Sequence, residues 1–171
     1  YKKLDDEGGI AIIYNNLGLL HEDYSNKELA IKYYRLSYQY WKNLDMPRYK
    51  AYSLNNIGVN LDDLGKPDSA IIYHNEALEI FKTLNDNEDL AWTYNLIGRH
   101  YLDQKNFNKS ELNLNKAYEL SEQNTSIETK RNIIENFYHL NGILKNYKSA
   151  LKYYKLFIHL NDSIKNENTQ K

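Results

Sequence analysis

A repeat of 40 residues runs through the sequence and strongly constrains what the chain can fold into. Asn-Asn-Leu-Gly at 15–18 returns as Asn-Asn-Ile-Gly at 55–58 and as Asn-Leu-Ile-Gly at 95–98. Other residues recur with the same shift, and a set of equivalent positions 40 residues apart is called a column. Such columns are Leu4, Leu44 and Leu84; Asp23, Asp63 and Asp103; and Ala30, Ala70, Ser110 and Ala150. A fixed period of this length is typical of chains that stack one supersecondary unit several times.

Each repeat carries two apolar stripes with helical spacing. In the first repeat, Ile10, Ile13 and Leu17 follow one another at three- and four-residue steps, which is the pattern of one face of a helix. A polar break at 23–26 separates this stripe from a second one. In the next repeat, Gly65 suits the end of a helix and Pro67 suits the first turn of the following helix. Each repeat is therefore predicted to be a helical hairpin.

The repeats divide the chain into four consecutive parts. We expect hairpins at about 5–44, 45–84, 85–124 and 125–165, joined by short loops near 44–47, 84–87 and 124–126. The polar residues 166–171 are expected to fray, as chain ends without packing partners commonly do. Residues 1–165 are thus predicted to form a single array.

Glycine occupies one column of the first helix in three repeats, at Gly18, Gly58 and Gly98. Glycine inside a helix costs roughly 1 kcal/mol relative to alanine, so its repetition predicts that the two helices of each hairpin approach closely there. The facing small residues are expected to be those of the column Ala30, Ala70, Ser110 and Ala150. The fourth repeat has Tyr138 in the glycine column, so we expect that hairpin to be splayed or packed differently.

Composition and charge exclude several classes of function. The 171 residues are 42% hydrophobic and 26% charged, which is typical of a folded chain. The net charge of −1 gives no positive field for gathering nucleic acid. No apolar run approaches the roughly 18 residues of a membrane-spanning helix. The chain contains no Cys, which rules out thiol nucleophiles and thiolate metal ligands but leaves the compartment open. We therefore expect neither nucleic acid binding nor membrane insertion through this segment.

No pattern of catalytic or cofactor-binding residues is recognisable. The five histidines are His21, His74, His100, His139 and His159. None of them forms the His-Glu-x-x-His pattern of a zinc site, and the sequence has no glycine-rich phosphate loop and no nucleophile elbow. We therefore predict a chain that is not an enzyme and needs no metal and no cofactor.

The repeat resembles the tetratricopeptide repeat (TPR) in the order of its large, small and aromatic residues. The matching residues are Tyr14, Leu17, Gly18, His21, Ala30 and Tyr34 in the first unit; Leu54, Ile57, Gly58, Leu61, Ala70 and His74 in the second; and Tyr94, Ile97, Gly98, Tyr101, Ser110 and Leu114 in the third. The fourth unit, with Ile134, Phe137, Tyr138, Asn141, Ala150 and Tyr154, matches in part.

The length of 40 residues differs from the usual 34 and is similar to the variety found in kinesin light chains and in bacterial peptide-sensing regulators. The C-terminal segment 160–164 is similar to the end of repeat arrays in bacterial sensor kinases. The resemblance implies an all-α fold, a right-handed α-solenoid of about four helical hairpins. It also implies a concave groove lined by the first helix of each hairpin, which binds a protein or a peptide.

Asparagine residues form the clearest column on the implied groove. Asn15, Asn55 and Asn95 share one position, and Asn16 and Asn56 stand beside them. A side-chain amide both donates and accepts hydrogen bonds, so such a ladder could pair with the main chain of an extended peptide. The alternative is that Asn, which is frequent throughout this chain, was copied by duplication without a function.

Charged residues of the implied groove suggest a second preference. Asp23, Asp63 and Asp103 stand near the C-terminal ends of the predicted helices, where the helix dipole disfavours negative charge. Their position suggests a ligand with positive charge, and the alternative is an acidic rim exposed to solvent. Arg99 is the main basic residue of the groove.

Two functions remain open at this stage. The chain could be the sensing or interaction segment of a larger bacterial regulatory protein, or a structural spacer that forms homo-oligomers through its end helices. The sequence opens on Tyr1 rather than Met, and Tyr1–Leu4 aligns with the end of a repeat at Trp41–Leu44. We therefore expect an earlier helix and a longer parent protein.

Overall fold

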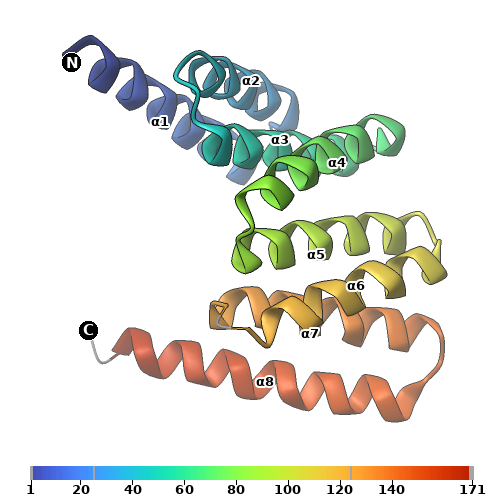
Figure 1. Ribbon diagram of the computed structural model, residues 1–171. Helices are drawn as coiled ribbons and strands as arrows, with labels where there is room; N and C mark the ends of the chain where they lie inside the picture. The colour runs from blue at the N-terminus through green and yellow to red at the C-terminus, as the bar shows by residue number, and fades with distance from the viewer. Residues whose placement is uncertain (1, 25, 124, 170–171) are drawn as a thin grey trace. The chain divides into compact units, whose positions relative to one another are not determined.

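The computed structural model describes residues 2–24, 26–123 and 125–169, and these form eight α-helices and no strand (Figure 1). The helices are α1 (Lys2–Asp23), α2 (Lys27–Asn43), α3 (Pro47–Asp63), α4 (Pro67–Leu84), α5 (Asn87–Asp103), α6 (Phe107–Ser121), α7 (Ile127–Ile143) and α8 (Tyr147–Thr169). The predicted all-α fold of helical hairpins is confirmed.

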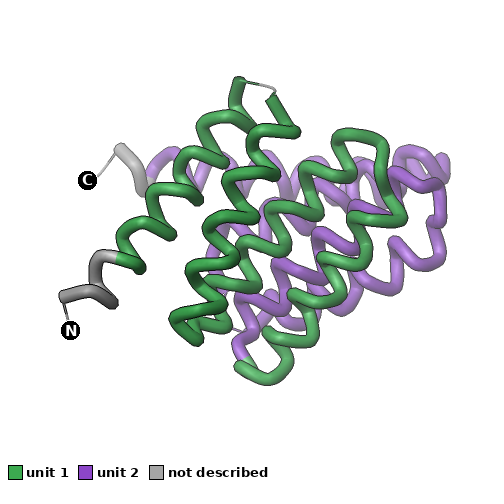
Figure 2. The backbone as a smooth tube through the Cα atoms, turned by 90° about the horizontal axis from the view of Figure 1, so that it is seen from above, with its two compact units in different colours: residues 1–85 green, residues 86–171 purple. Residues whose placement is uncertain are grey.

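The helices pack in consecutive pairs within two compact units (Figure 2). Unit 1 comprises residues 1–85 with helices α1 to α4, and unit 2 comprises residues 86–171 with helices α5 to α8. In unit 1, α1 packs against α2, α2 against α3 and α3 against α4; in unit 2, α5 packs against α6 and α7, α6 against α7, and α7 against α8. From the second helix onward, equivalent helices begin 40 residues apart, as at Lys27 and Pro67.

The turns between helices repeat the same backbone geometry. Gly65 has a φ of 69°, and the residues 40 and 80 positions later, Lys105 and Lys145, have φ values of 57° and 59°. The sequence expectation that Gly65 ends one helix and Pro67 begins the next is confirmed. Lysine in this left-handed region is strained, because its Cβ crowds the backbone in a way that glycine avoids.

Glycine at these two lysine positions is expected to stabilise unit 2. Relief of the left-handed strain outweighs the greater flexibility of glycine in the unfolded chain, so Lys105→Gly and Lys145→Gly should each raise the free energy of unfolding by about 0.5 to 1 kcal/mol. Thermal denaturation of each variant measures the change. Lys155→Gly, inside α8, is the control and should destabilise by about 1 kcal/mol. Equal effects at all three positions would contradict the strain argument.

The helices of the first three hairpins do approach closely at the glycine column, but the facing residue differs from the one expected. A Cβ built on Gly18 would lie 2.5 Å from the Tyr34 ring, and one on Gly58 would lie 2.6 Å from the His74 ring. One on Gly98 would lie 2.7 Å from Leu114. The expected Ala30, Ala70 and Ser110 are therefore not the nearest facing residues, because the glycine admits the larger side chain one helical turn later. In the fourth hairpin, which contains Ala150, no glycine stands in the column. The residues of that small column are buried in the core instead.

The fourth hairpin replaces this contact by a pair of aromatic rings. Tyr138, in the glycine column, meets Tyr154 with ring centroids 5.4 Å apart and an interplanar angle of 47°. Tyr154 stands in the column of Tyr34, His74 and Leu114. The expectation that this hairpin packs differently at the glycine column is confirmed.

The two ends of the array differ from the simple repeat. Residues 2–4 belong to the first turn of α1, although they align with the end of a helix one repeat later. Lysine and leucine are good helix formers and allow this extension. At the other end, α8 continues to Thr169, into the tail expected to fray. Residues 1, 170 and 171 lie outside the described residues.

Candidate functional site

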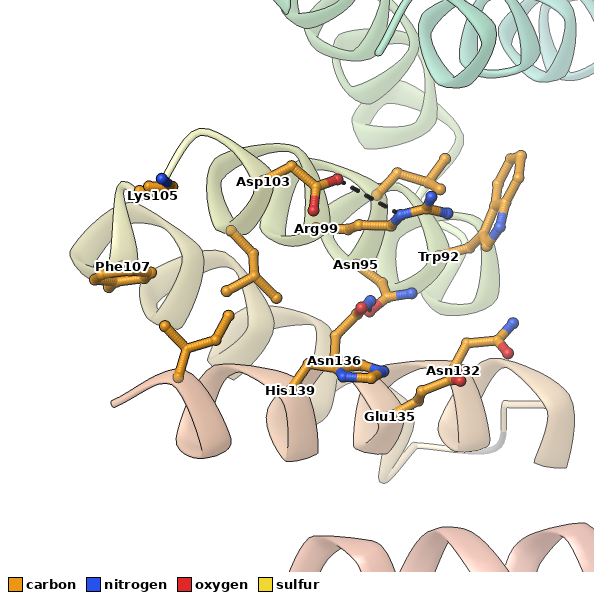
Figure 3. A pocket seen from close by; sticks show the side chains of 13 residues that line it. Trp92, Asn95, Arg99, Asp103, Lys105, Phe107, Asn132, Glu135, Asn136 and His139 are labelled. Atoms are coloured by element: carbon orange, nitrogen blue, oxygen red, sulfur yellow. Dashed lines mark hydrogen bonds and ion pairs between the residues drawn. The ribbon is translucent and has the colours of Figure 1, made fainter. Parts of the chain in front are cut away.

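Unit 2 contains a cleft of about 880 Å³ between α5 and α7 (Figure 3). Its walls come from the first helices of two successive hairpins and from the turn between α5 and α6. The lining residues are Trp92, Asn95, Leu96, Arg99, Leu102, Asp103, Lys105, Phe107, Asn132, Glu135, Asn136, His139 and Ile143. A volume of this size lies in the range of binding sites for small ligands or short peptide segments.

The middle of the cleft is polar. Asn136 Nδ2 donates a hydrogen bond of 2.8 Å to Asn95 Oδ1, which links α7 to α5. Asn95 is buried and Asn136 is half-buried, so the more exposed amide of the pair belongs to α7. On the α5 wall, Arg99 Nε lies 3.8 Å from Asp103 Oδ2 (Figure 3). His139, which lies beside Asn136 in Figure 3, is exposed.

The ends of the cleft carry aromatic side chains. Figure 3 shows Trp92 at one end, on α5, and Phe107 at the other, at the start of α6. Both are half-buried. Ile143, the last residue of α7, also lines the cleft and is 54% exposed. The cleft thus combines polar groups that can fix an orientation with apolar surface that a ligand can cover.

Three of the site residues predicted from the sequence meet in this cleft. Asn95, Arg99 and Asp103 all line it. Glu135 and His139, which occupy the columns of Asn95 and Arg99 one repeat later, line it as well. The remaining predicted residues, Asn15, Asn16, Asn55, Asn56, Asp23 and Asp63, belong to unit 1.

In unit 1 the two asparagine columns also pair with each other. Asn56 Nδ2 donates to Asn15 Oδ1 at 3.3 Å, which repeats the link between Asn136 and Asn95 with the same separation of 41 residues. Asn16 is exposed. Asn55 is completely buried, and its Oδ1 lies 3.0 Å from His74 Nδ1. The asparagine columns therefore connect the first helices of successive hairpins inside each unit, whether or not they also contact a ligand.

The acidic residues near the helix ends of unit 1 have partners within the protein. Asp63 Oδ2 lies 2.9 Å from Lys27 Nζ. Glu22 Oε2 accepts hydrogen bonds from the Tyr34 hydroxyl at 2.8 Å and from Asn60 Nδ2 at 3.0 Å. These contacts offset the unfavourable helix dipole. Asp23, at the end of α1, is exposed.

The hydroxyl of Tyr34 is expected to make the stability of unit 1 depend on pH. Burial, followed by Glu22, raises the pKa of Tyr34 above its ordinary value of 10, because both oppose the phenolate. The hydrogen bond therefore contributes fully below about pH 10 and is lost as the pH rises further. Tyr34→Phe should cost about 1 to 2 kcal/mol at neutral pH, and its deficit should shrink above about pH 10.

Urea unfolding of the Tyr34→Phe variant at several pH values measures this deficit. Tyr24→Phe is the matched control, because the Tyr24 side chain is 76% exposed and its hydroxyl should contribute nothing at any pH. A Tyr34→Phe deficit that stays constant through the alkaline range would contradict the proposed role of the hydroxyl.

Sequence reasoning missed a second pairing of columns, twelve residues apart. Glu22 accepts from Tyr34, and Asp62 Oδ2 lies 3.4 Å from His74 Nε2. In the third hairpin, Leu102 and Leu114 occupy the same two columns and belong to one hydrophobic cluster. The sequence contained the signal for this pairing. In the first two hairpins the earlier column is acidic and the later column has a hydrogen-bond donor, whereas in the third hairpin both columns hold leucine.

The described residues contain neither a helix that could span a membrane nor a group of side chains that could hold a metal ion. No helix in that part of the chain has both the length and the apolar character that a membrane span requires. Likewise, within residues 2–24, 26–123 and 125–169, no three His, Asp or Glu side chains gather in a way that could hold a metal ion.

Comparison with solved structures finds the same kind of helical fold. BtubC (BKLC) from P. vanneervenii aligns with a TM-score of 0.74 and 17% identity over 91% of this chain and 64% of its own. The apo form of RapI aligns with a TM-score of 0.72 and 19% identity, over 92% of this chain and 44% of its own. The TPR domain of Arabidopsis FLU aligns with a TM-score of 0.64 and 19% identity, over 69% of this chain and 99% of its own. The chain thus spans less than two thirds of BtubC and less than half of RapI.

Sequence comparison identifies the family. No curated protein matches the sequence. The family model of the tetratricopeptide repeat matches residues 9–83 and again residues 49–123, which together cover more than half of the chain. The hairpin geometry and the 40-residue register agree with this match. The chain belongs to the tetratricopeptide-repeat family.

Proposed function

We propose that the cleft between α5 and α7 binds an extended segment of a partner protein. Tetratricopeptide repeats form scaffolds for protein–protein interaction and are in general not catalytic. The observation that carries the proposal is the composition of the cleft, which joins a polar middle to two apolar ends within about 880 Å³.

The polar middle suits the main chain of such a segment. Asn136 uses one amide N–H on Asn95. An amide has a second N–H and an oxygen, and these can pair with a peptide C=O and N–H. Arg99 and Asp103 place opposite charges side by side, so the α5 wall favours neither strongly acidic nor strongly basic segments. Of the asparagine ladder predicted from the sequence, we therefore propose that the Asn95–Asn136 pair contacts the peptide.

The apolar ends suit large side chains of the same segment. Trp92 and Leu102 are ten residues apart on α5, which corresponds to about 15 Å along a helix. An extended peptide covers this length in four or five residues. A segment that carries two large apolar residues at that spacing could therefore contact both Trp92 and Leu102.

We place this binding activity within a larger regulatory protein. The partial coverage of BtubC and RapI by this chain is compatible with a repeat segment that works beside other parts. The direct test is to express the parent protein with and without the cleft variant described next, and to compare its regulatory output.

Selection of short random peptides on the purified chain tests the binding proposal. We expect peptides with two spaced apolar residues, and we expect Ile143→Ser to weaken them at least tenfold, since it removes apolar surface from the cleft. Ile72→Ser is the matched control, because Ile72 is an isoleucine of unit 1, 65% exposed and outside the cleft. Equal affinity for both variants would contradict the proposal.

A structural module that forms homo-oligomers is the second candidate. α1 exposes Ile12, Ile13, Leu19 and Leu20, and α8 exposes Leu151, Tyr154 and Ile158. Exposed apolar side chains on a helix favour association. A mass in solution that rises with concentration, and that returns to the monomer in an Ile13→Glu/Leu20→Glu variant, would support this candidate; a monomer at all concentrations would exclude it.

A further inference from the structure

Unit 1 contains a second cleft, of about 560 Å³, between α2 and α4. Leu54 and Ile57 of α3 form part of its lining, and both are buried, at 2% and 1% exposure. Tyr38 of α2 and Tyr73 of α4 also line it, and each is half-buried. All of its lining residues belong to unit 1, so this cleft is independent of the one between α5 and α7.

The repeat supplies an internal comparison for this cleft. Eighty residues later, unit 2 has Tyr118 on α6, Phe137 on α7 and Tyr153 on α8 in the columns of Tyr38, Ile57 and Tyr73. The Phe137 ring stacks on Tyr153, with centroids 5.0 Å apart and planes at 13°. It meets Tyr118 edge-on, with centroids 6.2 Å apart. In unit 2, therefore, a phenylalanine ring occupies the space between the two tyrosines.

Unit 1 keeps the two tyrosines but has the smaller Ile57 beneath them. Burial, followed by proximity to Glu76 and Tyr73, raises the pKa of Tyr38. Burial, followed by proximity to Tyr118 and Glu111, raises the pKa of Tyr153. In each unit, one tyrosine of the pair thus lies close enough to the other to affect its pKa. An isoleucine has no ring to place between them, and the cleft is lined by all three of these side chains.

We propose that the cleft between α2 and α4 receives an aromatic side chain of a partner protein, which inserts between Tyr38 and Tyr73 as Phe137 does between Tyr118 and Tyr153. Aromatic pairs in stacked or edge-on geometry add to the free energy of burying apolar surface. The phenylalanine of unit 2 shows that this arrangement of helices accommodates a ring.

Charged side chains at the rim of the cleft can contact the neighbour of the inserted ring. Arg35 precedes Tyr38 by three residues on α2, and its Nη2 donates to the Tyr73 hydroxyl at 3.4 Å. Arg35 is exposed and lines the cleft. A carboxylate next to the inserted ring can pair with this guanidinium. Lys32, Glu28 and Glu76 also line the cleft, so its rim carries both signs of charge, and an acidic residue beside the aromatic one is the neighbour that Arg35 in particular can bind.

Titration with the peptide N-acetyl-Gly-Phe-Asp-Gly-amide, followed by NMR of the labelled chain, tests the proposal. We expect the signals of Arg35, Tyr38 and Tyr73 to shift, and the same peptide with Ala in place of Phe to leave them unchanged. Ile57→Phe should fill the cleft and weaken binding at least tenfold. Phe137→Ile should open the equivalent space and add shifts at Tyr118 and Tyr153.

Two further variants keep the proposal testable if Ile57→Phe does not fold. Tyr38→Ala removes one wall and should abolish the shifts, whereas Tyr24→Ala, at a side chain 76% exposed and outside the cleft, should preserve them. Binding that survives Ile57→Phe or Tyr38→Ala would overturn the proposal, as would shifts that lie outside α2, α3 and α4 in the original chain.

Discussion

Replacing His74 by leucine is expected to lower the free energy of unfolding of unit 1 by about 2 to 4 kcal/mol. The imidazole is 1% exposed and lies between Asn55, 3.0 Å from Nδ1, and Asp62, 3.4 Å from Nε2. Leucine fits the space, since Leu114 occupies the same column in the third hairpin. The cost arises because the buried Asn55 amide and the Asp62 carboxylate each lose their polar contact with a ring nitrogen of His74. Each lost partner costs about 1 to 3 kcal/mol.

The third hairpin also indicates how this loss can be repaired. Its Leu102 and Leu114 fill the columns of Asp62 and His74 with an apolar pair. Asp62→Leu added to His74→Leu should therefore recover part of the lost stability, whereas Asp62→Leu alone should destabilise. A double-mutant cycle measures the coupling between the two residues. Additive effects would contradict the pairing of the two columns.

Fluorescence can follow the unfolding of unit 1 separately. The chain has two tryptophans, and Trp41 lies in unit 1 and Trp92 in unit 2. In a Trp92→Phe background, Trp41 reports only unit 1, where it is 6% exposed and stacks on Tyr49 with ring centroids 4.7 Å apart. The His74 variants are therefore best compared in this background.

Gly58→Ala is expected to destabilise unit 1 by about 1 to 3 kcal/mol, although alanine is the better helix former. The added Cβ would lie 2.6 Å from His74 Cε1 and 2.8 Å from each ring nitrogen. The buried ring would have to move away from Asn55 and Asp62, and overpacking of this kind typically costs about 1 to 3 kcal/mol. This cost exceeds the gain of roughly 1 kcal/mol in helix propensity.

The same substitution at Gly9 provides the control for Gly58→Ala. No atom lies within 4 Å of a Cβ built there, and Gly9 is exposed inside α1. Gly9→Ala should therefore stabilise unit 1 by up to about 1 kcal/mol. Thermal unfolding of both variants gives the two signs directly. A stabilising effect at Gly58 would show that the His74 ring can move without cost, contrary to the packing described above.

The sequence predicts the hairpins well because their signals are local and repeated. Helical spacing, Gly65 and Pro67 locate the turns, and the 40-residue shift then fixes the remaining ones. The partner of the glycine column was predicted wrongly for a geometrical reason. A missing Cβ can admit a large side chain as readily as a small one, and the sequence alone does not state which residue of the facing helix lies opposite.

The candidate site could be predicted only in part. Asn95, Arg99 and Asp103 were expected on one surface, and they line one cleft. The burial of Asn55 and the ion pair of Asp63 with Lys27 depend on neighbours from other helices, which periodicity does not reveal. The cleft between α2 and α4 is lined by residues of three helices, whose arrangement in space periodicity does not reveal either.

Photo-crosslinking of a selected peptide is the most direct test of binding between α5 and α7. p-Benzoylphenylalanine would replace His139, which lines the cleft and is exposed, or His159, which is equally an exposed histidine but lies on α8 outside the cleft. Binding in the cleft predicts a crosslink to the peptide from position 139 and none from position 159. A crosslink from position 159 with none from position 139 would contradict it.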